Sequence, residues 1–461
     1  MRHLYAVALL PTESLMSKTS KPLSVDLFAG AGGLSEGLRL AGYQTVVAND
    51  WDEWAAETYS DNHTKHGTIF VPGDITSAKV RKEILTATKG KEIDLVAGGP
   101  PCQAFSQVRN HDRETDDPRN SLYRHLLGIV RQLQPKVFVM ENVVGMKNLA
   151  GGKVGGKILR DLGMNGSYNV AWSILDAADY GVPQTRRRVL IVGVRSDMGL
   201  DPRFPRRTGA AERFQLIRSL DRRSRPFYRM PEEQLAMGEM SVLDRLLDPD
   251  NLEFVTVQQA IGDLVGWKPA ERLERKPSNE AFRYPGKATT AYQRIMRGSL
   301  TEVYNGDVPS IREDTTRRLA AIPQGGNFRD IPPELQGRYL NGTKWGPDIG
   351  RDELSRKHYY AYRKLHPDYF SWTLNTKTDC VYHYEALRAL SVREFARLHS
   401  FPDSYTFLNG DRHSRYAQVG NAVPPLLGKA IGEALLPLIR PARYKASRQP
   451  SFRVAERTAT V

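Results

Sequence analysis

The segment Ser24-Val-Asp-Leu-Phe-Ala-Gly-Ala-Gly-Gly33 decides the fold class of this chain. Its first six residues are mostly apolar and predict a short buried strand, and its glycines lead into the helical pattern from Leu34 to Ala41. A glycine turn between a strand and a helix lets backbone N–H groups approach a ligand. The order of strand, turn and helix therefore predicts an α/β fold that binds a ligand at the carboxyl end of this strand.

The glycine spacing disfavours the common phosphate-binding turns, because it matches neither the GxGxxG of dinucleotide folds nor a P-loop with its lysine. The next predicted strand, 44–49, ends in Asp50 and Trp51, and a third strand end offers Asp74. An acid at such an end can accept ribose hydroxyls, and Trp51 offers a flat face to an adenine. Together with Asp26, these acids favour a cationic nucleoside without phosphates, which fits S-adenosylmethionine better than NAD or ATP. Alternatively, each aspartate only caps the helix that follows it.

A fourth strand end presents a thiol. The predicted buried strand 92–97 is stopped by Gly98-Gly-Pro-Pro-Cys-Gln-Ala-Phe-Ser106, in which prolines stiffen the backbone before Cys102. Ligands of open α/β sheets bind at the carboxyl ends of the strands, so Cys102 is the candidate nucleophile. The alternative is a small buried side chain, as in most free cysteines.

Two further segments add charged groups to the same edge of the predicted sheet. The strand 135–140 is followed directly by Glu141, and Gln184-Thr-Arg-Arg-Arg188 precedes the strand 189–194. Arginines at the mouth of a site favour contacts with phosphates and bases. A solvated basic turn is the alternative.

The composition describes a globular protein rich in positive charge. Of 461 residues, 40% are hydrophobic and 26% are charged, and 66 Lys and Arg against 52 Asp and Glu give a formal net charge of +14. The length predicts two domains, and the charge favours a nucleic-acid partner, with a basic solvated surface as the alternative. The two cysteines, Cys102 and Cys380, are too few for a disulfide scaffold and fit a reducing cytosol. We predict no metal site and, because the apolar run 4–10 is too short to span a bilayer, no membrane association.

Six segments agree with one known family in order, spacing and chemistry. They are Asp26-Leu-Phe-Ala-Gly-Ala-Gly-Gly33, Gly99-Pro-Pro-Cys-Gln103, Glu141-Asn-Val143, Gln184-Thr-Arg-Arg-Arg188, Arg388 to Tyr405, and Gln418-Val-Gly-Asn-Ala-Val423. The chain thus resembles the bacterial DNA (cytosine-5)-methyltransferases over nearly its whole length outside the middle third.

This resemblance implies a doubly wound, Rossmann-like sheet that binds S-adenosylmethionine, and a second, smaller target-recognition domain. The implied boundaries are an N-terminal extension (1–22), a catalytic domain (23–200), a target-recognition domain (201–410), a segment returning to the catalytic domain (411–440) and a basic tail (441–461). The positions that match the family's cofactor site are Phe28, Ala29, Gly30, Gly33, Asp50, Trp51, Asp74, Ile75, Pro100, Leu122, Asn421 and Val423.

The resemblance also implies the catalytic roles. Cys102 adds to carbon 6 of the target cytosine, Glu141 binds N3 and the exocyclic amine, and Arg188 holds O2. Arg186 is expected to contact a phosphate or the loop that carries the thiol. The expected DNA contacts are Gln103, Ser106, Arg186, Thr373 and Thr376.

The implied partner is double-stranded DNA, bound by a monomer in the cytoplasm at the nucleoid, with a cognate restriction endonuclease or another defence-system protein as a further partner. Arginines and aromatics interleave over 203–229, which suits either a nucleic-acid surface or a solvated loop. Three other functions remain open. They are an RNA (cytosine-5)-methyltransferase acting on a tRNA loop, a catalytically silent DNA-binding regulator and, more remotely, a nicotinamide dehydrogenase.

Overall fold

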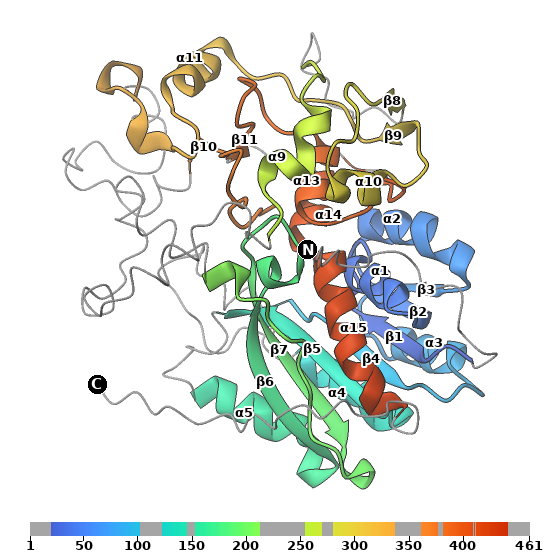
Figure 1. Cartoon of the computed structure of the whole chain (residues 1–461). Helices are drawn as coiled ribbons and strands as arrows, with labels where there is room; N and C mark the ends of the chain where they lie inside the picture. The colour runs from blue at the N-terminus through green and yellow to red at the C-terminus, as the bar shows by residue number, and fades with distance from the viewer. Residues whose placement is uncertain are drawn as a thin grey trace, which may run out of the picture.

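The structure is a computed structural model that describes residues 20–101, 122–144, 153–212, 254–269, 280–336, 361–376, 381–408, 410 and 412–440. The predictions for Cys102, Gln103, Ser106 and Cys380, for most of the basic segment 203–229 and for the tail 441–461 lie outside these residues. Figure 1 shows a lower part built on a large sheet and an upper part of short helices and small strands.

The lower part is a seven-stranded sheet in the order β3-β2-β1-β4-β5-β7-β6. The strands are β1 (Leu23–Leu27), β2 (Gln44–Asp50), β3 (Ile69–Pro72), β4 (Leu95–Gly98), β5 (Val137–Val143), β6 (Tyr168–Asp176) and β7 (Arg187–Arg195). Strands β1 to β5 pair in parallel, and β7 runs antiparallel to both β5 and β6. The strand order reverses between β1 and β4, so the carboxyl ends of these two strands border the crevice where ligands of such sheets bind. The predicted doubly wound α/β fold is confirmed.

Helices cover both faces of this sheet (Figure 1). They are α1 (Gly33–Leu40), α2 (Glu53–His63), α3 (Ala78–Ala87), α4 (Tyr123–Leu133), α5 (Lys153–Leu162) and, from the end of the chain, α15 (Pro425–Ile439). The helix before it, α14 (Arg412–Asn421), lies in the upper part of Figure 1. Short 3-10 turns follow at Thr64–His66, Met164–Gly166, Ala177–Tyr180 and Ser196–Met198.

Glycines hold the last helix of the chain against the first. A Cβ built on Gly37 of α1 would lie 2.5 Å from the Cα of Gly428 of α15, and one on Gly432 would lie 2.7 Å from the Cβ of Ala41. Side chains at these positions would force the helices apart. By length and composition alone His413–Ile439 could cross a membrane, but 67% of its most apolar window is buried inside the protein, as expected of a core helix.

The upper part is assembled from short elements. They are α9 (Val257–Ile261), η9 (Gly262–Leu264), β8 (Ala281–Arg283), α10 (Ala291–Arg297), β9 (Glu302–Tyr304), α11 (Glu313–Ala321), η10 (Phe328–Asp330), β10 (Arg363–Lys364), β11 (Val381–Tyr382) and α13 (Val392–Leu398). The described residues 254–256 form no strand, and the side chain of Thr256 caps α9 by accepting from the N–H of Gln259.

Buried ion pairs join these short elements around α13. The guanidinium of Arg388 donates to both carboxylate oxygens of Glu394 at 2.8 Å. Arg397 donates to Asp403 at 2.7 and 2.6 Å and to Asp263, in η9, at 2.9 Å. Such pairs are costly to bury unless both partners are fully hydrogen-bonded, and removing one partner leaves an uncompensated charge. The charged residues of the segment 388–405 therefore fix how these elements meet.

Residues 401–408 pack against helices of the lower part of the molecule. Phe401, Tyr405 and Phe407 are buried in the same apolar cluster as Leu34 and Leu38 of α1. Hydrogen bonds reinforce this packing, since the side chains of Thr58 and Asn62 donate to the carbonyls of Leu408 and Thr406. The expected domain boundaries stay predictions.

Candidate active site

The turn after β1 adopts the backbone conformation that its glycines were expected to allow. Gly30 and Gly32 have φ values of 53° and 87°, and Phe28 has a φ of 56° although it carries a side chain. Left-handed backbone at a bulky residue costs free energy and is concentrated at functional sites. The N–H of Gly30 donates to a carboxylate oxygen of Asp50 at 2.7 Å, which ties the turn to the end of β2.

The structure separates the acid that caps a helix from the acid that faces the turn. Asp52 is the N-cap of α2 and accepts from the N–H groups of Trp54 and Ala55. Asp50 does not cap α2 and instead bridges Gly30 and the N–H of Asp52, at 2.7 and 2.9 Å. Burial raises the pKa of Asp50, and these backbone hydrogen bonds lower it. Each of its oxygens keeps a lone pair that can accept from a hydroxyl group.

Four other predicted cofactor residues lie directly after β2, after β3 and before α4. The side chain of Trp51 is 69% exposed, an unusual position for an indole. Asp74 is exposed and accepts from the N–H of Thr76, whereas Ile75 is buried. Leu122 is half-buried at the start of α4.

The closing segment of the chain lies against the start of α1. A Cβ built on Gly33 would stand 2.3 Å from the carbonyl oxygen of Val423, so only glycine permits this approach. Val423 is buried, and Asn421 is exposed at the end of α14. The structure thus brings the predicted segment 421–423 to the glycine turn.

One expected cofactor acid is misplaced. Asp26 lies within β1 rather than at its end, is 1% exposed, and accepts a hydrogen bond from Ser35 of α1 at 2.6 Å. The hydroxyls of Ser35 and Tyr59 are 2.7 Å apart and extend this buried network. Burial raises the pKa of Asp26 to about 7. This aspartate therefore supports α1 from beneath and does not face the crevice.

We expect the free energy of unfolding of Asp26→Asn, compared with that of the wild type, to be higher at pH 8 than at pH 5. The folded-state pKa is raised above the unfolded value of 3.8, so stability from the bound proton is full below about pH 4 and is lost as the pH rises to about 7. The asparagine cannot ionise and still accepts from Ser35. Urea unfolding should show the mutant gaining at least about 1.4 kcal/mol on the wild type between these pH values, the equivalent of one pKa unit. An equal difference at both pH values would contradict the prediction.

A carboxylate and a guanidinium face each other at the far side of the crevice. Glu141 lies near the end of β5, and Arg188 lies at the start of the antiparallel strand β7, paired with Val143. The Nε atom of Arg188 lies 2.7 Å from Oε1 of Glu141, and each side chain is 14% exposed. Burial lowers the pKa of Arg188, and the charge of Glu141 opposes that shift.

The turn after β4 is fastened to the strand that carries this pair. The side-chain amide of Asn142 donates to the carbonyl of Pro100 at 3.1 Å. A Cβ on Gly99 would lie 3.2 Å from Oε2 of Glu141. Described residues end at Pro101, directly before Cys102. The crevice therefore gathers Gly99, Pro100, Glu141 and Arg188.

Arg186 does not occupy the position expected for it. Its side chain is 2% exposed and donates to the carbonyls of Leu374, Gly420 and Ala422. A phosphate cannot reach a guanidinium buried in this way, so the expected phosphate contact is corrected, whereas the alternative contact, with the loop that carries the thiol, falls on residues outside the described ranges. Its sequence neighbourhood gave no sign of this burial, because an arginine that binds phosphate and one that binds carbonyls leave the same pattern.

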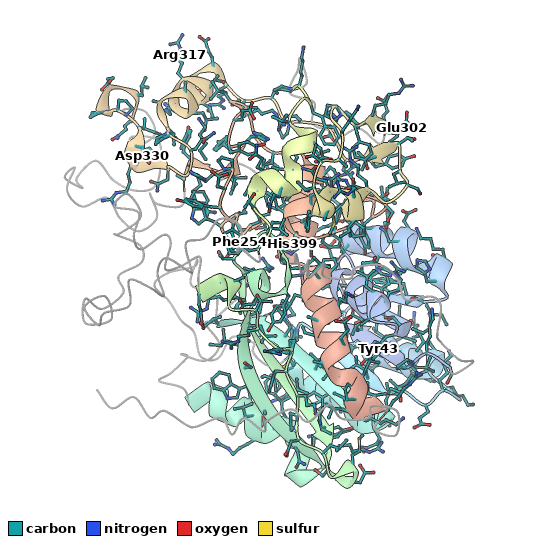
Figure 2. The ribbon with its side chains drawn as sticks, in the orientation of Figure 1. Tyr43, Phe254, Glu302, Arg317, Asp330 and His399 are labelled. Atoms are coloured by element: carbon teal, nitrogen blue, oxygen red, sulfur yellow. The ribbon has the colours of Figure 1, made fainter. Side chains whose placement is uncertain are left out.

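Thr373 and Thr376, predicted to contact DNA, are both exposed beside this arginine. The hydroxyl of Thr373 donates to the carbonyl of Thr185 at 2.7 Å. Sequence reasoning missed two buried residues nearby, His399 and Gly420, which lie within quoted motifs but received no role. His399, labelled in Figure 2, lies where the upper and lower parts meet.

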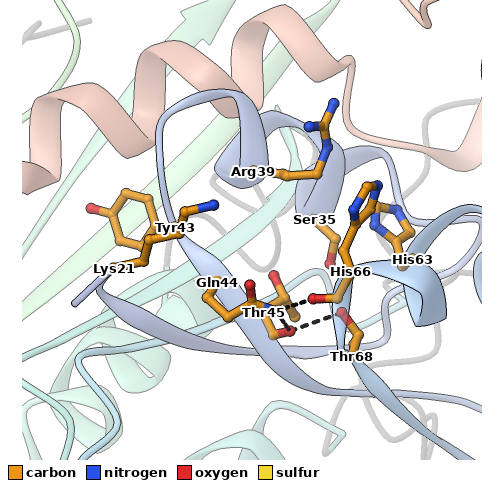
Figure 3. A pocket seen from close by; sticks show the side chains of 9 residues that line it. All are labelled: Lys21, Ser35, Arg39, Tyr43, Gln44, Thr45, His63, His66 and Thr68. Atoms are coloured by element: carbon orange, nitrogen blue, oxygen red, sulfur yellow. Dashed lines mark hydrogen bonds between the residues drawn. The ribbon is translucent and has the colours of Figure 1, made fainter. Parts of the chain in front are cut away.

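A separate cavity of about 180 Å³ lies beneath α1 (Figure 3). Its lining includes Lys21, Arg39, Tyr43, His63 and His66, none of which was predicted to belong to the site. Across the described ranges, no group of three or more His, Cys, Asp or Glu side chains could hold a metal ion.

Comparison with known proteins agrees with this geometry. The family model described as C-5 cytosine-specific DNA methylase matches residues 23–436. The type II methyltransferase M.AgeI of Thalassovita gelatinovora is 32% identical over 452 residues, which cover 89% of this chain and 98% of that protein. M.DdeI of Desulfomicrobium norvegicum is 31% identical over 429 residues, covering 89% of this chain and 88% of that protein. A solved structure described as a DNA modification methyltransferase encoded within an E. coli prophage shares the fold, with a TM-score of 0.61 at 23% identity over 91% of this chain and 99% of its own.

Proposed function

Because the chain belongs to the C-5 cytosine-specific DNA methylase family, we propose that it transfers a methyl group from S-adenosylmethionine to carbon 5 of a cytosine in a specific sequence of duplex DNA. The observation that carries this proposal is the facing pair of Glu141 and Arg188 beside the turn that leads to Cys102. A carboxyl group and a guanidinium side by side match the N3, amine and O2 edge of cytosine.

The residues at the ends of β1 and β2 fit the cofactor. S-adenosylmethionine supplies an electrophilic methyl group on a sulfonium. The strained turn from Phe28 to Gly30 brings backbone to the crevice, Asp50 keeps lone pairs for ribose hydroxyls, and the exposed indole of Trp51 offers a face to an adenine. The closing segment with Asn421 and Val423 would line the methionine end.

Cys102 would supply the nucleophile. Carbon 5 of cytosine is a weak nucleophile until a thiolate adds to carbon 6, which makes the ring an enamine. Glu141 would bind N3 and the amine while charge builds on the ring, and Arg188 would hold O2. After carbon 5 has accepted the methyl group, loss of its proton and of the thiolate restores the aromatic ring.

The target base must leave the duplex, because stacking hides carbon 6. Turning it into the pocket costs a few kcal/mol. The expected contacts of Gln103, Ser106, Thr373 and Thr376 with DNA belong to this step. The net charge of +14 supports binding to the DNA backbone, and we propose that the protein acts in the cytoplasm as the modifying partner of a restriction system, as the type II names of its relatives suggest.

Bisulfite sequencing of a plasmid from an expressing host that lacks other cytosine methyltransferases tests this function. We expect one cytosine of a short recognition sequence to resist conversion to uracil at every copy of that sequence, and cytosines elsewhere to be converted. An unmodified plasmid would argue against the proposal. Tritium transfer to the same duplex and to tRNA, assayed side by side, separates DNA from RNA methylation, and a covalent complex with 5-fluorocytosine duplex excludes a silent DNA-binding regulator.

A further inference from the structure

Three buried side chains join residues 420–423, which would line the cofactor, to residues 371–376, where contacts with DNA are expected. We propose that Gln184, Arg186 and His399, here called the hub, are positioning residues that couple the binding of cofactor to the binding of DNA. The inference rests on the proposed function, which places the cofactor beside residues 420–423 and DNA beside residues 371–376.

Arg186 holds both segments at once. One terminal nitrogen, Nη1, donates to the carbonyl of Leu374 at 3.2 Å. The other, Nη2, donates to the carbonyls of Gly420 and Ala422 at 2.7 and 3.1 Å. A single planar guanidinium therefore fixes the distance between the two segments, because its nitrogens cannot move independently.

Gln184 and His399 complete the connection. The side-chain oxygen of Gln184 accepts from the N–H of Leu374 at 3.0 Å, and its nitrogen donates to Nδ1 of His399 at 3.0 Å. The other ring nitrogen of His399 then carries the hydrogen and donates to the carbonyl of Ala422 at 2.9 Å. Both backbone groups of Leu374 are thus held by the hub, one by Gln184 and one by Arg186.

The two segments also touch directly. A Cβ built on Gly420 would lie 2.4 Å from the carbonyl oxygen of Asn375, closer than real side chains approach. Thr376 follows at once, and Thr373 precedes Leu374 in the same segment. A shift of residues 420–423 would therefore displace Asn375 and its neighbours, because close-packed interiors transmit such displacements.

The charge on Arg186 makes this connection sensitive to small movements. Burial lowers the pKa of its guanidinium, and the nearby charge of Arg188 lowers it further. Its Nε atom is buried without a hydrogen-bond partner in the described part of the chain. A buried cation that relies on carbonyl dipoles loses much of its stabilisation when one carbonyl moves away. The hub therefore favours one arrangement in which both segments are in place.

Such an arrangement predicts reciprocal coupling between the two ligands. A ligand that orders residues 420–423 also orders Leu374 and its neighbouring threonines, and so raises the affinity for DNA. DNA bound at those threonines must then raise the affinity for the cofactor by the same factor. Figure 2 places His399 between the upper and lower parts of the molecule, where a connection of this kind would act.

The test measures the affinity for a labelled duplex of the mapped recognition sequence, with and without saturating S-adenosylhomocysteine, by fluorescence anisotropy. For the wild type we expect S-adenosylhomocysteine to tighten DNA binding about 5-fold or more. Arg186→Lys keeps a positive charge but cannot span three carbonyls, and Arg186→Met keeps only the length of the side chain. In both variants the ratio should fall below about 2.

Arg318→Met is the control, since Arg318 is also buried and donates to the carbonyl of Leu335, to the carboxylate of Asp314 and to the hydroxyl of Tyr362, away from both segments. It should lower stability yet keep the wild-type ratio. If Arg186 variants weaken binding of each ligand but keep the ratio, Arg186 is merely structural and the inference is overturned while the proposed function stands. A wild-type protein that binds no S-adenosylhomocysteine would overturn both.

Discussion

Replacing Cys102 with serine should abolish methyl transfer, lowering turnover by at least about 10³-fold. The hydroxyl of serine does not ionise near neutral pH, whereas a thiol does so readily and its thiolate is strongly nucleophilic. Without addition at carbon 6, carbon 5 cannot attack the methyl group. A methyl-tritium assay on duplex DNA measures the loss, and calorimetry with S-adenosylhomocysteine should show cofactor affinity within a few-fold of the wild type.

The chain offers a matched control in its other cysteine. Cys380 lies apart from every quoted motif, so Cys380→Ser should keep its activity and its covalent trapping by 5-fluorocytosine DNA. Cys102→Ser should lose both. If the Cys102 variant turns over as fast as the wild type, Cys102 is not the nucleophile. The alternative, that it is a small buried side chain, would then hold.

The sequence predicted the parallel part of the sheet because clear signals end its strands, whereas β6 (Tyr168–Asp176) was not predicted. The glycine turn at residues 30–33 and the glycine and proline pairs after residue 97 end their strands abruptly. These signals also brought Asp50 and Glu141 to one edge, since parallel strands end on the same side of a sheet. The partnership of Glu141 and Arg188 needed more, because it depends on β7 running antiparallel beside β5.

Residue type alone could not separate neighbours with different roles. Asp50 and Asp52 are two residues apart, and only the structure shows that the second is the helix cap. Arg186 and Arg188 are likewise two apart, yet one binds carbonyls and the other a carboxylate. The difference lies in contacts with segments far along the chain. Gln184 and His399, for example, are 215 residues apart, and no local pattern records their meeting.

The side chain of Glu141 is expected to carry a large part of the catalytic effect. Glu141→Gln preserves size and can still accept from Arg188, but it cannot carry the negative charge that binds a protonated N3. We expect the single-turnover rate of methyl transfer to fall by at least about 10²-fold. DNA affinity should change only a few-fold, because phosphate contacts supply most of it.

Two further variants separate chemistry from position. Glu92→Gln removes an exposed carboxylate before β4, at the opposite end of the strands, and should leave the rate unchanged. Gly99→Ala adds a Cβ 3.2 Å from Oε2 of Glu141, which should displace the carboxylate and lower the rate without changing any charge. A folded Glu141→Gln protein with wild-type rates would show that the pair with Arg188 only holds β5 against β7. A variant that fails to fold would assign the same structural role, because Arg188 would then have needed its counter-charge to remain buried.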